Sequence, residues 1–320
     1  MLTKDWFAHY GRQFGTLFGL AVLCLVLWGL TPRFLTVDNL LNVAQQAAIN
    51  AIIAVGMTFV IITAGIDLSV GSVLAFSGVV FGSVFHAGLP LPIAVAAGLA
   101  IGLLCGMVNG TLITFSRLPP FIATLGMMSV ARGAALLYSS GKPISLFSAS
   151  MSSETFLRLA DSKFLSVPAP VLIMVAIYVM AHFLLTRTTL GRYTYAIGGN
   201  EEAAVLSGVN VKAYKIAVYG LCGLLSGVAA ILLSARLKSA GPNAGIMYEL
   251  DAIAATVIGG TSLMGGEGAV LGTLIGAFIM GVLRNGLVLL DVSPYLQNVV
   301  IGSVIILAVM IDMTLKRQKM

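Results

Sequence analysis

Long apolar runs follow one another along almost the whole sequence, and they restrict the possible folds more than any other feature. Only 9% of the 320 residues are charged, whereas 58% are hydrophobic. An average globular chain has roughly 25% charged residues, so this chain lacks the polar surface that a water-soluble globule needs. The composition predicts an all-α membrane protein. It excludes a soluble enzyme, and because the net charge of +6 is dispersed, it also excludes a nucleic-acid-binding protein.

The lengths of the apolar runs set the expected number of membrane crossings. A helix needs about 20 apolar residues to cross the bilayer core. We therefore expect residues 1–320 to form a single transmembrane domain, a polytopic helical bundle of about ten spans with broken helices. The expected spans are 14–31, 46–63, 68–86, 91–115, 121–139, 167–186, 213–234, 249–264, 269–290 and 295–313.

The distribution of Lys and Arg predicts the orientation of the bundle. With both termini in the cytoplasm, the inside segments hold more cations than the outside segments, as membrane proteins prefer. Two segments are long enough to leave the membrane. Residues 140–166 form the predicted periplasmic loop, and residues 187–212 form a polar, glycine-rich cytoplasmic segment.

Two glycine-rich segments, 65–72 and 259–268, interrupt apolar runs without the polarity of an exposed loop. Irregular backbone at membrane depth is tolerated only where protein or a water-filled cavity surrounds it. We expect a helix to restart after each break, with Asp67 or Ser69 and Glu267 as caps or first-turn acids. Breaks in both halves of a transporter point to its solute pathway.

Polar side chains inside the predicted spans allow two interpretations, helix–helix hydrogen bonding or contact with a solute. Because they are mostly amides and hydroxyls, they suit a neutral polyhydroxylated solute better than an ion. Arg132 and Arg284 are costly within a span unless they are paired, and Glu249 or Asp251 is the expected partner. Gln46 belongs to the same uncharged group. The pathway or gating candidates are Asn50, Asp67, Ser69, Asn109, Thr261, Ser262 and Asn285.

Small residues recur every four positions in several predicted spans, a spacing that allows close helix contact in lipid. The clearest series are Gly98, Gly102, Gly106 and Gly110, then Gly223 and Gly227, and then Gly268, Gly272 and Gly276.

Sequence motifs for catalysis and energy supply do not occur. The sequence has no phosphate-binding loop, no metalloprotease motif and no nucleophile elbow. Its three histidines are isolated, and its three cysteines lie in apolar runs without metal or disulfide spacing. We therefore predict no catalytic residue, metal site or cofactor in this chain, and an energy source outside it.

The cytoplasmic segment contains a short predicted helix between two glycine-containing ends. Acidic residues in its first turn complement the helix dipole, and its small face suits contact with another protein. In this interpretation Gly198, Gly199 and Asn200 end the preceding element, Glu201 and Glu202 open the helix, Ala203, Ala204 and Ser207 form the small face, and Gly208 closes it.

Three stretches in this order resemble the membrane permeases of bacterial monosaccharide ABC importers of the ribose type. They are AVGMT to GIDLSVGS (54–72), LGRYTYAIGGN to SGVN (190–210), and ELDAIAA to GGTSL and GGEG (249–268). The similarity covers about residues 34–312. The segment 198–208 matches the ATPase-coupling site of such permeases, although the Ile-x-Leu-Pro that ends the general coupling motif is missing.

The resemblance implies an inner-membrane complex. Two permease copies would line a pathway, a cytoplasmic ABC ATPase (one fused chain or two) would hold ATP and Mg²⁺, and a periplasmic sugar-binding protein would deliver ribose or a close relative. Two alternatives remain open: an ATP-independent secondary transporter or facilitator, and a permease of the same family with another cargo.

Overall fold

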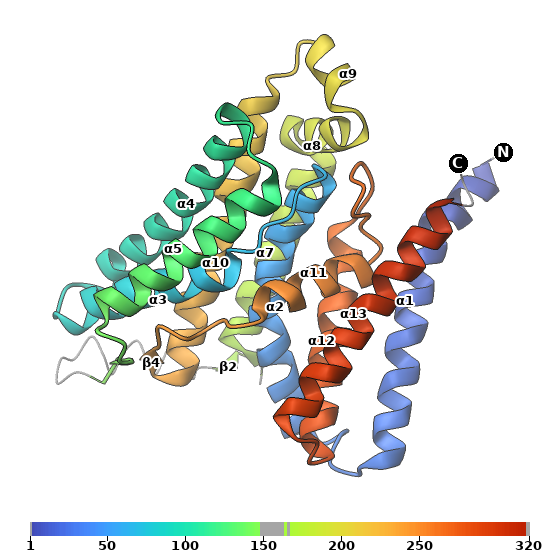
Figure 1. Ribbon diagram of the computed structural model, residues 1–320. Helices are drawn as coiled ribbons and strands as arrows, with labels where there is room; N and C mark the ends of the chain where they lie inside the picture. The colour runs from blue at the N-terminus through green and yellow to red at the C-terminus, as the bar shows by residue number, and fades with distance from the viewer. Residues whose placement is uncertain (1, 148–162, 165–166, 318–320) are drawn as a thin grey trace.

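The computed structural model describes residues 2–147, 163–164 and 167–317, and it confirms the all-α prediction (Figure 1). Two short antiparallel strand pairs, β1 (Ile144–Ser145) with β4 (Ser239–Ala240) and β2 (Lys163–Phe164) with β3 (Val167–Pro168), accompany the helices. Most of the predicted loop 140–166 lies outside the described residues. The helices are α1 (Leu2–Leu30), α2 (Val37–Ile62), α3 (Val70–His86), α4 (Leu91–Phe115), α5 (Pro120–Tyr138), α7 (Ala169–Arg187), α8 (Thr189–Gly199), α9 (Glu201–Leu206), α10 (Val211–Leu237), α11 (Tyr248–Ile258), α12 (Val270–Leu289) and α13 (Pro294–Arg317).

Helix α2 forms the centre of the bundle. From Ala47 to Ile62 every residue except Asn50 is buried, and α2 packs against α7, α10, α11 and α12. Peripheral helices expose large apolar side chains instead, such as Phe18 on α1, Leu137 on α5 and Val179 on α7. An apolar exterior around an apolar core is expected where lipid replaces water as the solvent, so the chain is a multi-pass membrane protein.

The number of predicted spans is confirmed only in part. Among the described residues, six helices, α2, α4, α5, α7, α10 and α12, are long and apolar enough to cross a membrane. Three shorter apolar helices, Phe14–Leu30, Val70–His86 and Pro294–Met310, correspond to three further predicted spans. The structure therefore supports a polytopic bundle without confirming ten complete spans.

The eighth predicted span, 249–264, needs correction because α11 has only 11 residues. At 1.5 Å per residue its length is about 17 Å, well short of the roughly 30 Å hydrocarbon core. Met247 and Gly260, both with positive φ, lie just outside its two ends. In Figure 1 the chain approaches α11 from the β4 end of the bundle and leaves toward the α8 end. This crossing therefore combines a half-length helix with irregular backbone.

In Figure 1 the start of α1 and the end of α13 lie at the same end of the bundle as α8 and α9. This placement agrees with the predicted even number of crossings.

The glycine series mediate close helix packing, as predicted. Gly102 of α4 lies against the backbone of Gly223 of α10, so a side chain at either position would collide with the other helix. Gly272 of α12 meets Gly259 in the same way. Gly268 is an exception, because it lies in the loop before α12.

Candidate functional site

The predicted coupling segment forms α8 and α9, which cap one end of the bundle between α7 and α10 (Figure 1). Its local structure is as the sequence predicted. Helix α8 ends at Gly199, and the Asn200 side chain caps α9 by accepting a hydrogen bond from the Ala203 backbone N–H at 2.9 Å. Glu201 and Glu202 occupy the first turn of α9, and Gly208 follows with φ +82°.

The outward face of α9 is apolar rather than small. Leu206 is 88% exposed and Val205 is also exposed, beside Ala203 and Ser207. The predicted small face is wrong for Ala204, which is buried. A helix of six residues has to bury one side against the bundle, and Ala204 provides that side by packing with Ile197 and Val211.

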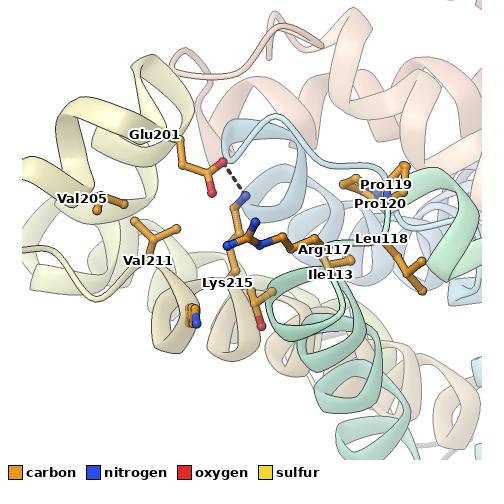
Figure 2. A pocket seen from close by; sticks show the side chains of 11 residues that line it. Ile113, Arg117, Leu118, Pro119, Pro120, Glu201, Val205, Val211 and Lys215 are labelled. Atoms are coloured by element: carbon orange, nitrogen blue, oxygen red, sulfur yellow. Dashed lines mark hydrogen bonds and ion pairs between the residues drawn. The ribbon is translucent and has the colours of Figure 1, made fainter.

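A cavity of about 470 Å³ lies beside α9, between the α4–α5 turn and the start of α10 (Figure 2). Within it, the Lys215 ammonium donates a hydrogen bond to the Glu201 carboxylate at 2.6 Å, which ties α9 to α10. The Arg117 side chain extends across the cavity from the turn (Figure 2). The cavity therefore combines cations with the apolar walls of Val205 and Val211.

Gly198, at the end of α8, joins the coupling segment to the end of α2, just before the first break, and to the second break. Its Cα packs directly against the carbonyl oxygen of Ile62, the last residue of α2. The same oxygen accepts a hydrogen bond from the Gly266 N–H at 2.9 Å, and Gly266 belongs to the second break. Three segments distant in sequence thus meet at one backbone junction, which hydropathy gave no means of predicting.

Tyr195 makes a second connection from α8 to the second break. Its hydroxyl donates a hydrogen bond to the Gly268 carbonyl oxygen at 2.6 Å. Burial raises the pKa of Tyr195, so the hydroxyl remains a donor at physiological pH. The sequence analysis missed this residue, because a tyrosine in an amphipathic helix has no distinctive spacing.

The first break is braced by a buried polar cluster. Asp67, only 1% exposed, accepts hydrogen bonds from the Ser69 backbone N–H at 2.9 Å and from the Ser69 hydroxyl at 2.6 Å. The Asn109 amide of α4 donates to the Ser69 hydroxyl oxygen at 2.9 Å. Ser69 occupies the N-cap position of α3 without a side-chain cap bond. Asp67 therefore holds the turn before α3 rather than capping the helix, because it accepts its hydrogen bonds from Ser69 and not from a backbone N–H inside α3.

The second break folds back on itself as a tight loop. The Ser262 N–H donates to the Glu267 carbonyl oxygen at 3.0 Å, and the Ser262 hydroxyl oxygen accepts from the Met264 N–H at 3.1 Å. Thr261 and Ser262 are fully buried. The expectation that Glu267 is a first-turn acid is wrong, because α12 begins only at Val270 with Ala269 as its N-cap. The loop carries Glu267 away from the helix start.

The remaining polar candidates join helices. The Asn285 and Asn39 side chains exchange two hydrogen bonds of 2.9 and 3.0 Å between α12 and α2. The predicted ion pair of Arg284 is confirmed: its guanidinium donates to both carboxylate oxygens of Asp251 at 2.8–2.9 Å. Asn50 also donates to Asp251, at 3.3 Å.

Arg132 is held by backbone rather than by a carboxylate. Its guanidinium donates hydrogen bonds to the carbonyl oxygens of Pro242 and Ala244 at 2.6 and 2.9 Å, in the segment between β4 and α11. These carbonyl oxygens therefore replace the expected direct ion pair of Arg132 with Glu249 or Asp251.

The fold and the junction at Gly198 define a class of protein. It is a multi-pass helical membrane protein in which the α8–α9 segment contacts the regions where two membrane helices are interrupted. Within the described residues, no group of three or more His, Cys, Asp or Glu side chains is arranged to hold a metal ion. Geometry of this kind can transmit movement from one end of the bundle to its interior.

Comparison with known proteins gives the family. Residues 39–309 match the family described as branched-chain amino acid transport system / permease component. The chain is 50% identical to the ribose import permease protein of Escherichia coli K12 over 97% of this chain and 95% of that protein. It is 48% identical to the ribose import permease protein of Bacillus subtilis, over 94% and 92%. The D-allose transport system permease protein of Escherichia coli K12 is 38% identical, over 96% and 93%.

The chain therefore belongs to this family of transport permeases. Its relatives are named as transport components rather than enzymes. No solved structure matches the chain.

Proposed function

We propose that this chain is the permease subunit of a bacterial ABC importer that carries ribose, or a closely related monosaccharide, across the inner membrane. The observation that carries the proposal is similarity at 50% identity, over nearly the full length of both chains, to a ribose import permease. Permeases for D-allose and xylose are more distant, at 38% and 36% identity. The gradient in identity favours ribose as the cargo.

The proposed orientation places α8, α9 and both termini in the cytoplasm. Arg117, Arg192, Lys212 and Lys215 gather at that end of the bundle, in agreement with the preference for cations on the cytoplasmic side. A partner ABC ATPase would dock there and hold ATP and Mg²⁺. A periplasmic sugar-binding protein would dock at the β4 end, and a second permease copy would complete the pathway.

Helix α9 supplies the proposed docking contact. An apolar side chain as exposed as Leu206, on a helix clear of the apolar spans, is expected to insert into a partner's groove. Ala204 would hold the helix in place from beneath rather than touch the partner. The proposed coupling residues are Gly198, Gly199, Asn200, Glu201, Glu202, Ala203, Ala204, Ser207 and Gly208.

The junction at Gly198 gives the proposed route from the ATPase to the pathway. Movement of α8 and α9 would displace the end of α2 and the loop 259–269 together, because Gly198 contacts both. A ligand shifts a conformational equilibrium only by its different affinity for the two states. ATP on the partner would therefore supply the bias, and specificity for the sugar would reside mainly in the binding protein.

Reconstitution tests the proposal. The permease, its ATPase and its binding protein in liposomes should accumulate labelled ribose only with ATP, and unlabelled ribose should compete better than D-allose or xylose. Replacing the exposed Ala203 with Trp should abolish uptake and ATPase binding without lowering the unfolding temperature. Thr111→Val, an exposed change on α4, is the matched control. Ribose accumulation by the permease alone would instead establish the secondary-transporter alternative.

A further inference from the structure

Three amide side chains, Asn42, Gln46 and Asn50, recur every four residues along α2 and therefore share one face of the helix. From the helix start at Val37, the 1.5 Å rise per residue places Asn42 about 8 Å along the helix and Asn50 about 20 Å along it. The Gln46 amide donates a hydrogen bond to the Asn42 oxygen at 3.2 Å. Figure 1 shows the start of α2 at the β4 end of the bundle, so these residues follow α2 from that end toward the middle of the helix.

Side chains from three other helices extend this polar surface. Arg236 of α10 donates to the Asn42 amide oxygen at 3.0 Å. At the inner end, Asn50 and Arg284 both donate to Asp251, and the Arg284 side chain remains 29% exposed. We call this surface the polar stripe; its members are Asn42, Gln46, Asn50, Arg236, Asp251 and Arg284.

The polar stripe differs from the polar residues that face outward elsewhere in the spans. The exposed hydroxyls of Thr111 and Ser303 donate to carbonyl oxygens of their own helices, those of Met107 and Val299, at 2.7 and 2.8 Å. The hydroxyl groups of such residues form hydrogen bonds within their own helix, so these residues can face lipid. The amides of the polar stripe have no such backbone partner among the described hydrogen bonds, and the Asn50 Oδ1 accepts no hydrogen bond within the described residues.

The hydrocarbon tails of lipids offer no hydrogen-bond partners to the amide and guanidinium groups of the polar stripe. Amides and a partly exposed guanidinium group at membrane depth are stable only where they face protein or a water-filled cavity. Arg284 is paired with the Asp251 carboxylate, whereas Arg236 donates to the neutral Asn42 amide oxygen and keeps its positive charge. The stripe therefore offers amide and guanidinium donors together with amide and carboxylate acceptors, and this combination suits the hydroxyl groups of a sugar.

We propose that the polar stripe is one wall of the solute pathway, opening at the β4 end, where it hydrogen-bonds the hydroxyls of a neutral sugar. The inference rests on the proposed function for the identity of the sugar. It assigns pathway contacts to Asn42, Gln46, Arg236 and Arg284. In contrast, Asp67, Ser69, Asn109, Thr261, Ser262 and Asn285 are buried within the single chain. All of them except Thr261 make side-chain hydrogen bonds that brace the breaks or join helices.

Thiol accessibility tests whether water reaches the polar stripe. In a chain whose three native cysteines are replaced by alanine, Asn42→Cys and Gln46→Cys should react with a charged, membrane-impermeant methanethiosulfonate in the assembled importer. We expect labelling at least about tenfold faster than at Thr111→Cys, the lipid-facing control, because the reactive thiolate forms only in water. If both cysteines react as slowly as Thr111→Cys, lipid or a second copy of the chain covers the stripe, and the inference is overturned.

Transport gives a second, independent measurement. Asn42→Leu and Gln46→Leu keep the side-chain size but remove the hydrogen bonds, so ribose uptake by the reconstituted importer should fall about tenfold. Thr111→Val should transport normally, and the unfolding temperature of each variant identifies a folding defect. Normal uptake in both leucine variants would overturn the inference. If the unmodified importer instead fails to carry ribose, the proposed cargo is wrong, while thiol labelling still decides the stripe.

Discussion

Gly198→Ala is the sharpest test of the junction between the coupling segment and the helix breaks. A Cβ at this position would lie 2.6 Å from Gly266 N and 2.8 Å from the Ile62 carbonyl carbon, and closer still to the Ile62 oxygen. Ordinary contacts of this kind are longer than 3.4 Å. Backbone on both sides has to move by roughly 1 Å or more, because no flexible side chain can yield.

The expected cost follows from this overlap. Overpacking costs about 1–3 kcal/mol, and the displaced Ile62 oxygen also loses its hydrogen bond from Gly266. An energy of this size changes a conformational equilibrium by roughly 5- to 150-fold. We expect ATP-driven ribose uptake to fall by at least about tenfold, while the buried α2–α10–α12 core remains folded.

Gly126→Ala, on α5 and outside the coupling segment, is the matched control. A Cβ at Gly126 meets nothing within 4 Å, so this variant should transport like the unmodified protein. Uptake, ATP hydrolysis and unfolding temperature are measured for both variants in the reconstituted importer. If Gly198→Ala transports ribose as well as Gly126→Ala does, the junction does not couple the segment to the breaks.

Substitutions at the Asp251–Arg284 pair, at Asp67 and at Tyr195 test three further contacts. Asp251→Asn leaves Arg284 without its carboxylate and should destabilise the protein by about 3 kcal/mol in thermal unfolding; combining Asp251→Leu with Arg284→Met should restore most of that loss. Asp67→Asn keeps the oxygen that accepts both hydrogen bonds in the first break, so stability and uptake should stay near normal, whereas Asp67→Ala should cost about 1–3 kcal/mol. Tyr195→Phe removes only the hydroxyl that binds the second break, so uptake should fall several-fold with little change in unfolding temperature; unchanged uptake would show that this bond plays no part in coupling.

Local patterns in the sequence were sufficient for much of the architecture. Apolar length placed the spanning helices, and the glycine breaks at 65–72 and 259–268 correspond to irregular backbone. The capping pattern around Asn200 predicted α9 correctly. These predictions are correct because each feature depends only on the side chains of one short segment and on the solvent around it.

Hydropathy did not predict the length of α11 or the direction in which Ala204 of α9 points. The run 249–264 is apolar enough to predict a span, yet Met247 and Gly260 adopt positive φ and limit α11 to a half-length helix. Ala204 belongs to a small face in the sequence but turns inward, because the shape of the bundle decides which side of a short helix is covered.

The sequence by itself determined that this protein is a helical membrane protein, because composition and spacing are properties of the chain alone, while the permease class followed from its resemblance to a known family. Only the tertiary structure decided which polar groups form hydrogen bonds within the chain and which can still bind another molecule. Asn285 and Asn50 are the same residue type in similar apolar runs, yet Asn285 pairs with Asn39 while Asn50 Oδ1 accepts no hydrogen bond within the described residues. The difference lies in the neighbouring helix, and residues far apart in sequence supply that neighbour.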